Sequence, residues 1–159
     1  MTRTRGALVS GVLVAIMLVV SACMTTDEQT GFNLINTERS SRGIATLAAN
    51  ETLVVKAQNW SRGLLANSGG VCSGTTLRHS NLTDGAPAGW RALGENVGCS
   101  ISSSVSGAVQ SMHSGFMGSS GHRANILGTG YNNGAVGVAS SQLANGMYLV
   151  FETQEFAQL

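Results

Sequence analysis

Residues 50–66 read NETLVVKAQNWSRGLLA and predict the principal helix of the domain. Asn50 stands at the position of an N-cap, ahead of the first apolar residue. The large apolar side chains then recur at intervals of four, three and four residues, which places them on one helical face: Leu53, Ala57, Trp60 and Leu64. We therefore expect this helix to anchor the hydrophobic core.

Two further helices are expected on either side of it. Residues 32–39 carry apolar side chains on one helical face and are followed by Gly43, a suitable helix terminator. After the serine run 102–104, apolar residues again recur at intervals of four, three and four over 105–116, and this pattern ends near Gly118.

The C-terminal quarter has the pattern of strands. Residues 134–139 and 147–151 are joined by a turn around Asn145-Gly146. Two strands alone are marginally stable, so we expect a third from residues 67–101, a stretch rich in Gly, Ser, Asn and Thr that otherwise predicts a long ordered loop with short helical pieces. Helices on the faces of such a sheet give an α+β fold, a three-layer α-β-α sandwich with an antiparallel sheet.

The N-terminus has the plan of a secretory signal peptide. Arg3 and Arg5 precede an apolar run over 7–22, which is shorter than the roughly 20 residues of a membrane-spanning helix. The sequence Val20-Ser21-Ala22-Cys23 resembles the bacterial lipobox, in which the cysteine is acylated and becomes the new N-terminus. The alternatives are an uncleaved membrane anchor, or plain secretion with an incidental cysteine.

These features predict three segments. Residues 1–22 are a lipoprotein signal peptide, residues 23–31 a polar tether that begins with lipidated Cys23, and residues 32–159 a single folded domain. The protein is then a bacterial lipoprotein on the extracytoplasmic side of the cell membrane.

The charge balance argues against a nucleic-acid partner. Without Arg3 and Arg5, the chain carries seven basic and eight acidic residues, and Lys56 is its only lysine. Neither a phosphate-binding surface nor a polybasic membrane patch is present in the sequence. The hydrophobic share of 43% is ordinary for a folded core.

Two cysteines remain if Cys23 is acylated. Disulfides persist outside the cytoplasm, so we expect a bridge between Cys72 and Cys99. The alternative, a zinc pair, lacks the usual C-x-x-C spacing.

Few residues could carry chemistry. His79 and His122 lie in polar stretches, the second at the opening of a short helix, and both are site candidates. Glu95, in Leu93-Gly94-Glu95-Asn96-Val97, is flanked by apolar residues and glycine, so it is expected to be partly buried and to need a partner, either in a site or in structural bonds to backbone amides. His113 reads as a surface or half-buried helix residue.

These pieces, in this order and spacing, resemble the CAP superfamily of cysteine-rich secretory proteins, antigen 5 and pathogenesis-related 1 proteins, in its compact bacterial form. The resemblance covers about residues 32–156. It is carried by Ile35-Asn36, Arg39, Gly43, Leu47, Asn50, Leu53, Ala57-Gln58, His79-Ser80, Gly94-Glu95-Asn96, Ser119 to Asn125 and the strand at 134–139.

The resemblance implies an α-β-α sandwich with a central cleft lined by two histidines and two acidic residues. His79 matches the first histidine, Glu95 the glutamate of the G-E-N motif and His122 the second histidine. The implied cleft contains His79, Ser80, Glu95, Asn96, Ser119 and His122.

The second carboxylate of the family does not transfer. The helix before His122 contains no acid, Gln110 and Ser119 are the nearby polar residues, and Phe116 stands where the family usually has tryptophan. Two imidazoles and one carboxylate, His79, Glu95 and His122, are still the ligand set of an open zinc site, and they would hold magnesium or calcium less well.

Three functions follow. The first is an envelope-anchored binding module whose cleft takes a metal, a small polar ligand or a lipid-like molecule, and whose partners include lipids, glycans or proteins. The second is a hydrolase in which His79 or His122, oriented by Glu95, activates Ser80 or Ser119, or in which a metal assists with Glu95 as base. No G-x-S-x-G or H-E-x-x-H motif is present to support it. The third is a structural envelope protein.

Overall fold

The structure is a computed structural model that describes residues 23–159, so the expected signal peptide lies outside the described residues. Within these residues, four helices and four strands form an α+β fold. Their bounds are α1 Thr26–Ser40, β1 Ala48–Ala49, α2 Glu51–Asn67, β2 Ala92–Ser102, α3 Val105–Gly118, α4 Ser120–Ile126, β3 Asn133–Gln142 and β4 Tyr148–Gln158.

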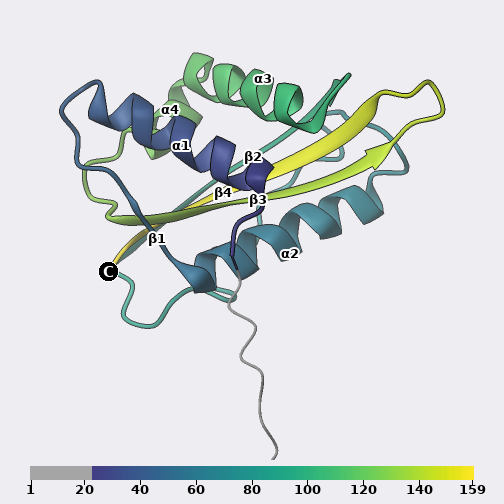
Figure 1. Cartoon of the computed structure of the whole chain (residues 1–159). Helices are drawn as coiled ribbons and strands as arrows, with labels where there is room; N and C mark the ends of the chain where they lie inside the picture. The colour runs from purple at the N-terminus through teal and green to yellow at the C-terminus, as the bar shows by residue number, and fades with distance from the viewer. Residues whose placement is uncertain (1–22) are drawn as a thin grey trace, which may run out of the picture.

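The elements form three layers, as expected. Figure 1 shows α1, α3 and α4 on one face of the sheet and α2 on the other. Alternate residues of β4 face the two layers: Phe156 packs with the helices of the first face, whereas Phe151 packs with Leu64 of α2. Helix α2 packs tightly against the sheet at Gly137 of β3, where a Cβ atom would lie 2.2 Å from the Ala57 carbonyl carbon of α2. Only glycine lets α2 lie this close to the sheet.

The sheet has the order β1-β3-β4-β2. Its three long strands are antiparallel, but the two-residue β1 pairs parallel with the start of β3, so the sheet is mixed and not purely antiparallel. The chain between α1 and α2 passes the start of β3 in the same direction, and the Asn50 N–H then donates to the Gly134 carbonyl. Strand β2, which supplies the expected third strand, forms one edge of the sheet.

Helix α1 begins six residues before the expected start at Phe32. Thr25 and Glu28 form a capping box, because the Thr25 side chain accepts from the Glu28 N–H and the Glu28 carboxylate accepts from the Thr25 N–H. The expectation of a polar tether over 23–31 is therefore wrong from Thr26 onward. Those polar residues form the first turns of a helix.

The other two helix starts agree with the sequence. The Asn50 side chain accepts from the Leu53 N–H at 3.1 Å and caps α2, and the Ser104 side chain accepts from the Gly107 N–H at 3.1 Å and caps α3. The turn around Asn145-Gly146 also forms, with Gly146 at a positive φ of 81°.

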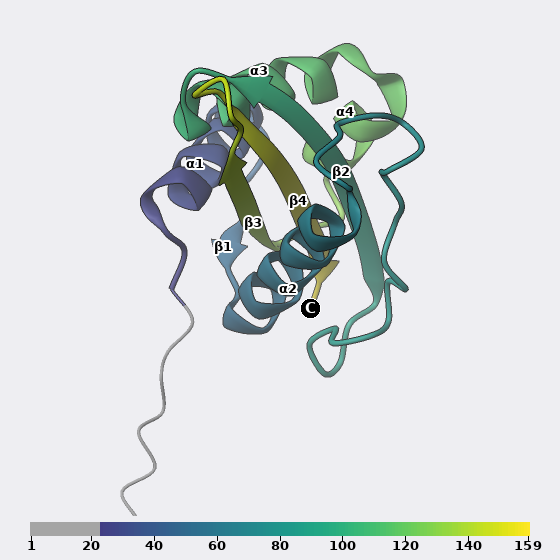
Figure 2. The ribbon, with the colours of Figure 1, turned by 90° about the vertical axis from the view of Figure 1, so that its right-hand side faces the viewer.

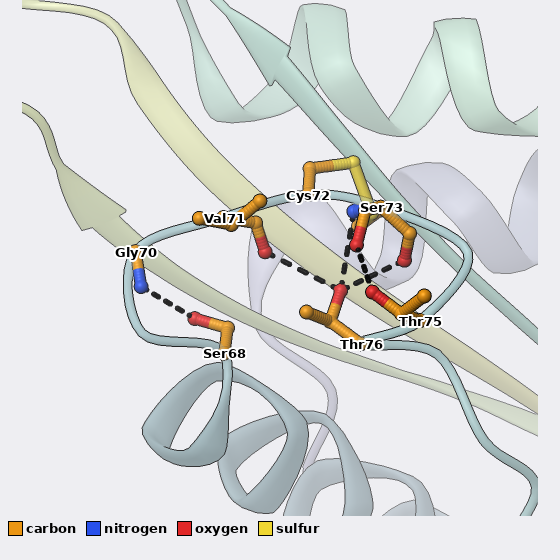
Figure 3. The surroundings of a disulfide bond; sticks show 8 residues. Ser68, Gly70, Val71, Cys72, Ser73, Thr75 and Thr76 are labelled. Carbon is orange, nitrogen blue, oxygen red and sulfur yellow. Dashed lines mark hydrogen bonds between the residues drawn. A yellow bond between two sulfur atoms is a disulfide. The ribbon is translucent and has the colours of Figure 1, made fainter.

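The expected disulfide joins Cys72 to Cys99. It fixes the loop that follows α2 to the edge strand β2, and Figure 3 shows the Thr76 side chain bonded within the same turn. This loop contains turns but none of the short helices predicted for it, and its last expected residues belong instead to β2. The loop carries His79 along the sheet edge.

Strand β4 is longer than the sequence predicts and continues to Gln158. Four consecutive polar residues in it are buried: Glu152, Thr153, Gln154 and Glu155. Among residues 23–159, no helix has the length and apolar character needed to cross a membrane.

Candidate functional site

Three of the expected site residues meet at the N-terminal half of β2. The His79 Nδ1 atom lies 2.7 Å from Glu95 Oε1, and the backbone N–H of Ser80 donates to the same oxygen at 2.9 Å. Glu95 is buried, whereas 62% of the His79 side chain is exposed. A buried carboxylate therefore holds an imidazole that faces solvent.

The second oxygen of Glu95 belongs to a buried charged cluster. Lys56, from α2, places its Nζ 3.9 Å from Glu95 Oε2 and donates to Ser80 Oγ at 2.9 Å and to Glu155 Oε1. Burial raises the pKa of Glu155 to about 8, an effect that Lys56 opposes and that the Glu95 charge reinforces. Lys56 is therefore the cationic partner that the two buried carboxyl groups of Glu95 and Glu155 share.

This arrangement fixes the chemistry that His79 offers. Glu95 Oε1 already accepts from the Ser80 N–H, and the Nδ1–H tautomer of His79 lets the same oxygen accept from the ring as well. The other ring nitrogen, Nε2, is then the free acceptor. The His79 side chain is one wall of a hollow of about 400 Å³, which is also lined by Ser80, Leu82, Leu93, Gly94, Glu95 and Asn125.

His122 lies on α4, at a second hollow along the same edge strand. This hollow has a volume of about 350 Å³ and is lined in part by Val97 to Ser100 of β2, Phe116 and Ser119. The rings of His122 and Phe116 meet edge to face at 5.0 Å. Burial lowers the pKa of His122, and the neighbouring His79 lowers it further.

Asn96 connects β2 to α4 from the opposite side of the strand. Its Nδ2 donates to the His122 carbonyl at 3.1 Å and to Gln154 Oε1 at 3.0 Å, while its Oδ1 accepts from Asn125 at 2.9 Å. Successive residues of a strand point to opposite faces, so Glu95 serves the histidine of the loop and Asn96 the histidine of the helix.

The glycine of the G-E-N motif has a steric role. A Cβ atom on Gly94 would lie 2.6 Å from the Tyr131 hydroxyl and 3.0 Å from Asn125 Oδ1. The motif therefore combines a close approach at Gly94 with one polar side chain toward each histidine.

With this geometry established, the chain can be compared with known proteins. The sequence profile of the cysteine-rich secretory protein family, CAP, matches residues 32–156. The chain belongs to the CAP family. No curated protein sequence matches it closely enough to count as a relative.

Several solved CAP structures share the fold. An extracellular protein with an SCP domain from Bacillus anthracis is 24% identical, with a TM-score of 0.60 over 84% of this chain and 40% of that one. An outer surface protein of Borrelia burgdorferi is 13% identical, with a TM-score of 0.60 over 83% of this chain and 92% of that one. A cysteine-rich secretory protein of Staphylococcus aureus is 16% identical, with a TM-score of 0.53 over 84% of this chain and 38% of that one.

The chain therefore spans less than half of the Bacillus and Staphylococcus proteins. At these identities the likeness shows the fold alone.

The residues of this CAP domain do not fit the zinc site considered from the sequence. Glu95 Oε1 is occupied by His79 and Ser80, and its Oε2 is buried beside Lys56. Within residues 23–159, no group of three or more His, Cys, Asp or Glu side chains is placed to hold a metal ion. Glu95 holds the His79 imidazole and is not available as a metal ligand.

The serine chemistry considered for a hydrolase is not assembled either. Ser80 Oγ accepts a hydrogen bond from Lys56. A serine nucleophile activated by histidine would instead donate its hydroxyl proton to the imidazole. Ser119 lines the same hollow as His122, but in the described part of the chain no serine hydroxyl is hydrogen-bonded to His79 or His122.

Sequence reasoning missed Lys56 and Glu155 as members of the site. Lys56 falls between the apolar positions of α2, and Glu155 ends a polar run that lies beyond the expected strand 147–151. One signal was available: the only lysine of the chain lies next to the apolar stripe of its principal helix, where a charge needs a partner.

His113 is not the surface or half-buried residue expected. It is only 5% exposed, because it faces α1, where its Nε2 lies 3.8 Å from Glu38 Oε1. Neither ring nitrogen has a hydrogen-bond partner, and burial lowers the pKa of His113 despite the Glu38 charge. It lies away from the β2 edge.

Proposed function

We propose that the protein is an exported CAP-domain binding module, anchored to the cell membrane by a lipid on Cys23, that holds a polar ligand in the cleft along β2. We define this cleft by the two hollows that follow β2, one lined by His79, Ser80 and Glu95 and the other by Ser119 and His122. Asn96, expected in the cleft, is fully buried and lines neither hollow. The signal-like N-terminus and lipobox support export and anchoring. The Cys72–Cys99 disulfide and the extracellular or outer-surface location named for two structural neighbours agree with them.

One observation carries the binding role: buried Glu95 fixes the orientation of exposed His79. Holding an imidazole in one orientation costs conformational entropy, and burying a carboxylate costs solvation. A surface histidine without a functional role requires neither a fixed ring orientation nor a buried carboxylate partner. The pair resembles the polar groups that fix a ligand's orientation in a binding pocket.

The lining indicates the kind of ligand. The free Nε2 of His79 accepts a hydrogen bond, and Leu82 and Leu93 supply apolar walls beside it. The same hollow therefore suits a ligand with hydroxyl or amide donors on a partly apolar frame. Envelope glycans and their amide-bearing fragments have this chemistry.

The test compares thermal stability with and without three probes: N-acetylglucosamine oligomers, phospholipid micelles and zinc chloride. A soluble form that starts at Met24 is measured beside His79→Ala/His122→Ala. We expect the sugar to raise the Tm of the unsubstituted protein and not that of the double variant, because a ligand stabilises only the state that binds it.

The matched control is Ser114→Ala, on an exposed position of α3. It should respond like the unsubstituted protein. A double variant with a much lower Tm, together with no effect of any probe on any form, would favour a structural role for the cluster. Saturable zinc binding lost in the double variant would restore the metal interpretation.

A further inference from the structure

The segment after Cys23 is fixed to the sheet edge formed by β3. Glu28 is buried, its Oε1 accepts from the Val138 N–H of β3 at 3.0 Å, and its Oε2 accepts from Gln58 of α2 at 2.9 Å. Beyond its short pairing with β1, β3 has no strand on this side, so the start of α1 covers an otherwise open edge.

Almost no free chain separates this contact from Cys23. Thr25 is the N-cap of α1, and Met24 packs against the core clusters on both faces of the sheet. The Cys23 carbonyl lies 3.5 Å from the Gln58 side chain, while Cys23 itself is exposed. One residue reaches only about 3.6 Å even when extended, so a group attached at Cys23 stays beside the β3 edge.

The cleft lies at the opposite edge of the same sheet. The strand order is β1-β3-β4-β2, and both histidine hollows follow β2. Figure 2 shows the separation: α1 lies on the side of β1 and β3, whereas β2, α4 and the loop after α2 lie on the other side.

We propose that the anchor at Cys23 holds the domain with its β3 edge on the membrane surface and the β2-edge cleft facing away from it. This inference rests on the proposed anchoring, whether the apolar segment 7–22 is replaced by a lipid or kept. The ligand then enters the cleft from the aqueous side. A soluble or wall-borne molecule fits this geometry, and a lipid embedded in the same bilayer does not.

The experiment uses the full lipidated protein in vesicles of phosphatidylethanolamine and phosphatidylglycerol that contain a lipid with a nitroxide quencher on its headgroup. Two exposed serines receive a fluorophore through a new cysteine: Ser140→Cys on β3 and Ser120→Cys beside His122 on α4. Each new thiol is the only reactive one, because Cys72 and Cys99 are bridged and Cys23 is acylated.

We expect the label at Ser140 to be quenched several-fold more strongly than the label at Ser120. Insertion of ten Gly/Ser residues between Cys23 and Met24 should make the two labels equal, because it releases the domain from the edge contact. Equal or reversed quenching without the insertion would overturn the orientation.

A separate readout tests the anchor itself. Unsubstituted protein should sediment with membranes, and Cys23→Ser should remain in the soluble fraction if the anchor is a lipid. Protein that never sediments would contradict the proposed anchoring, and the orientation with it. If the protein sediments but the two labels are quenched equally, the result contradicts the orientation alone.

Discussion

The two faces of β4 carry buried polar clusters of different kinds. Toward α2, Glu155 takes part in the charged cluster with Lys56 and Glu95, which opens to solvent at His79. Toward α1 and α3, Glu152 accepts from Gln154 at 2.8 Å, and Gln154 accepts from Asn96, which bonds the His122 carbonyl.

The difference lies in charge and access. The first cluster uses a buried ion pair to orient an exposed side chain. The second is a chain of buried side-chain amides with no access to solvent, and it ends at the Glu152 carboxyl group. Burial raises the pKa of Glu152 to about 7. One cluster therefore presents a functional group, and the other positions a piece of backbone. Both are supplied by alternate residues of a single strand.

The largest effect is expected from breaking the charged cluster. Lys56→Met leaves the Glu95 and Glu155 carboxyl groups buried without the cation they share, and removing one partner of a buried pair costs about 3–5 kcal/mol. Urea unfolding at pH 7 measures the loss. The double variant Lys56→Met/Glu155→Gln should regain part of it, since the group in direct contact with Lys56 can then carry no charge. A double variant that loses the sum of both single effects would show that the charges do not act together.

A smaller effect, of opposite sign, is expected in the closed cluster. The folded pKa of Glu152, about 7, lies above its ordinary value of 4.5, so this group favours folding at low pH and its contribution is lost as the pH rises through 7. Glu152→Gln removes this loss and should be more stable than the unsubstituted protein by up to about 3 kcal/mol at pH 9. At pH 4 the two should agree. Unfolding curves that differ equally at both pH values would refute this explanation.

The smallest effect is expected at the exposed end of the charged cluster. His79→Gln should change the free energy of unfolding by less than about 1 kcal/mol, because 62% of the side chain is already exposed and Glu95 keeps its bond from Ser80. The same substitution should remove ligand binding. A loss of stability as large as that of Lys56→Met would mean that His79 is part of the structural core.

Much of the fold could be predicted from local signals. The apolar spacing and the N-caps predicted α2 and α3. The two remaining cysteines predicted the disulfide, and Asn145-Gly146 predicted the hairpin turn. The G-E-N motif and the polar stretch Ser119 to Asn125 also pointed to Glu95 and His122, which lie on β2 and α4. Each of these depends on neighbours in the sequence or on a pairing with few alternatives.

The rest depends on partners distant in the sequence. Residues 152–155 are polar and lie beyond the expected strand, yet they are buried, and α2 and β2 supply hydrogen-bond partners for them: Lys56, Ser61 and Asn96. The early start of α1 depends on Glu28 reaching the β3 edge. The division of the site into two hollows follows from β2 lying between them, which no local pattern shows.

The central claim is that Glu95 holds His79 with a proton on Nδ1 and leaves Nε2 free for a ligand. Long-range ¹H–¹⁵N NMR spectra of the imidazole at pH 8 test it directly, with Glu95→Ala for comparison. The account predicts that neutral His79 is an Nδ1–H tautomer in the unsubstituted protein and a mixture in the variant. An Nε2–H tautomer, or identical spectra for the two proteins, would contradict it.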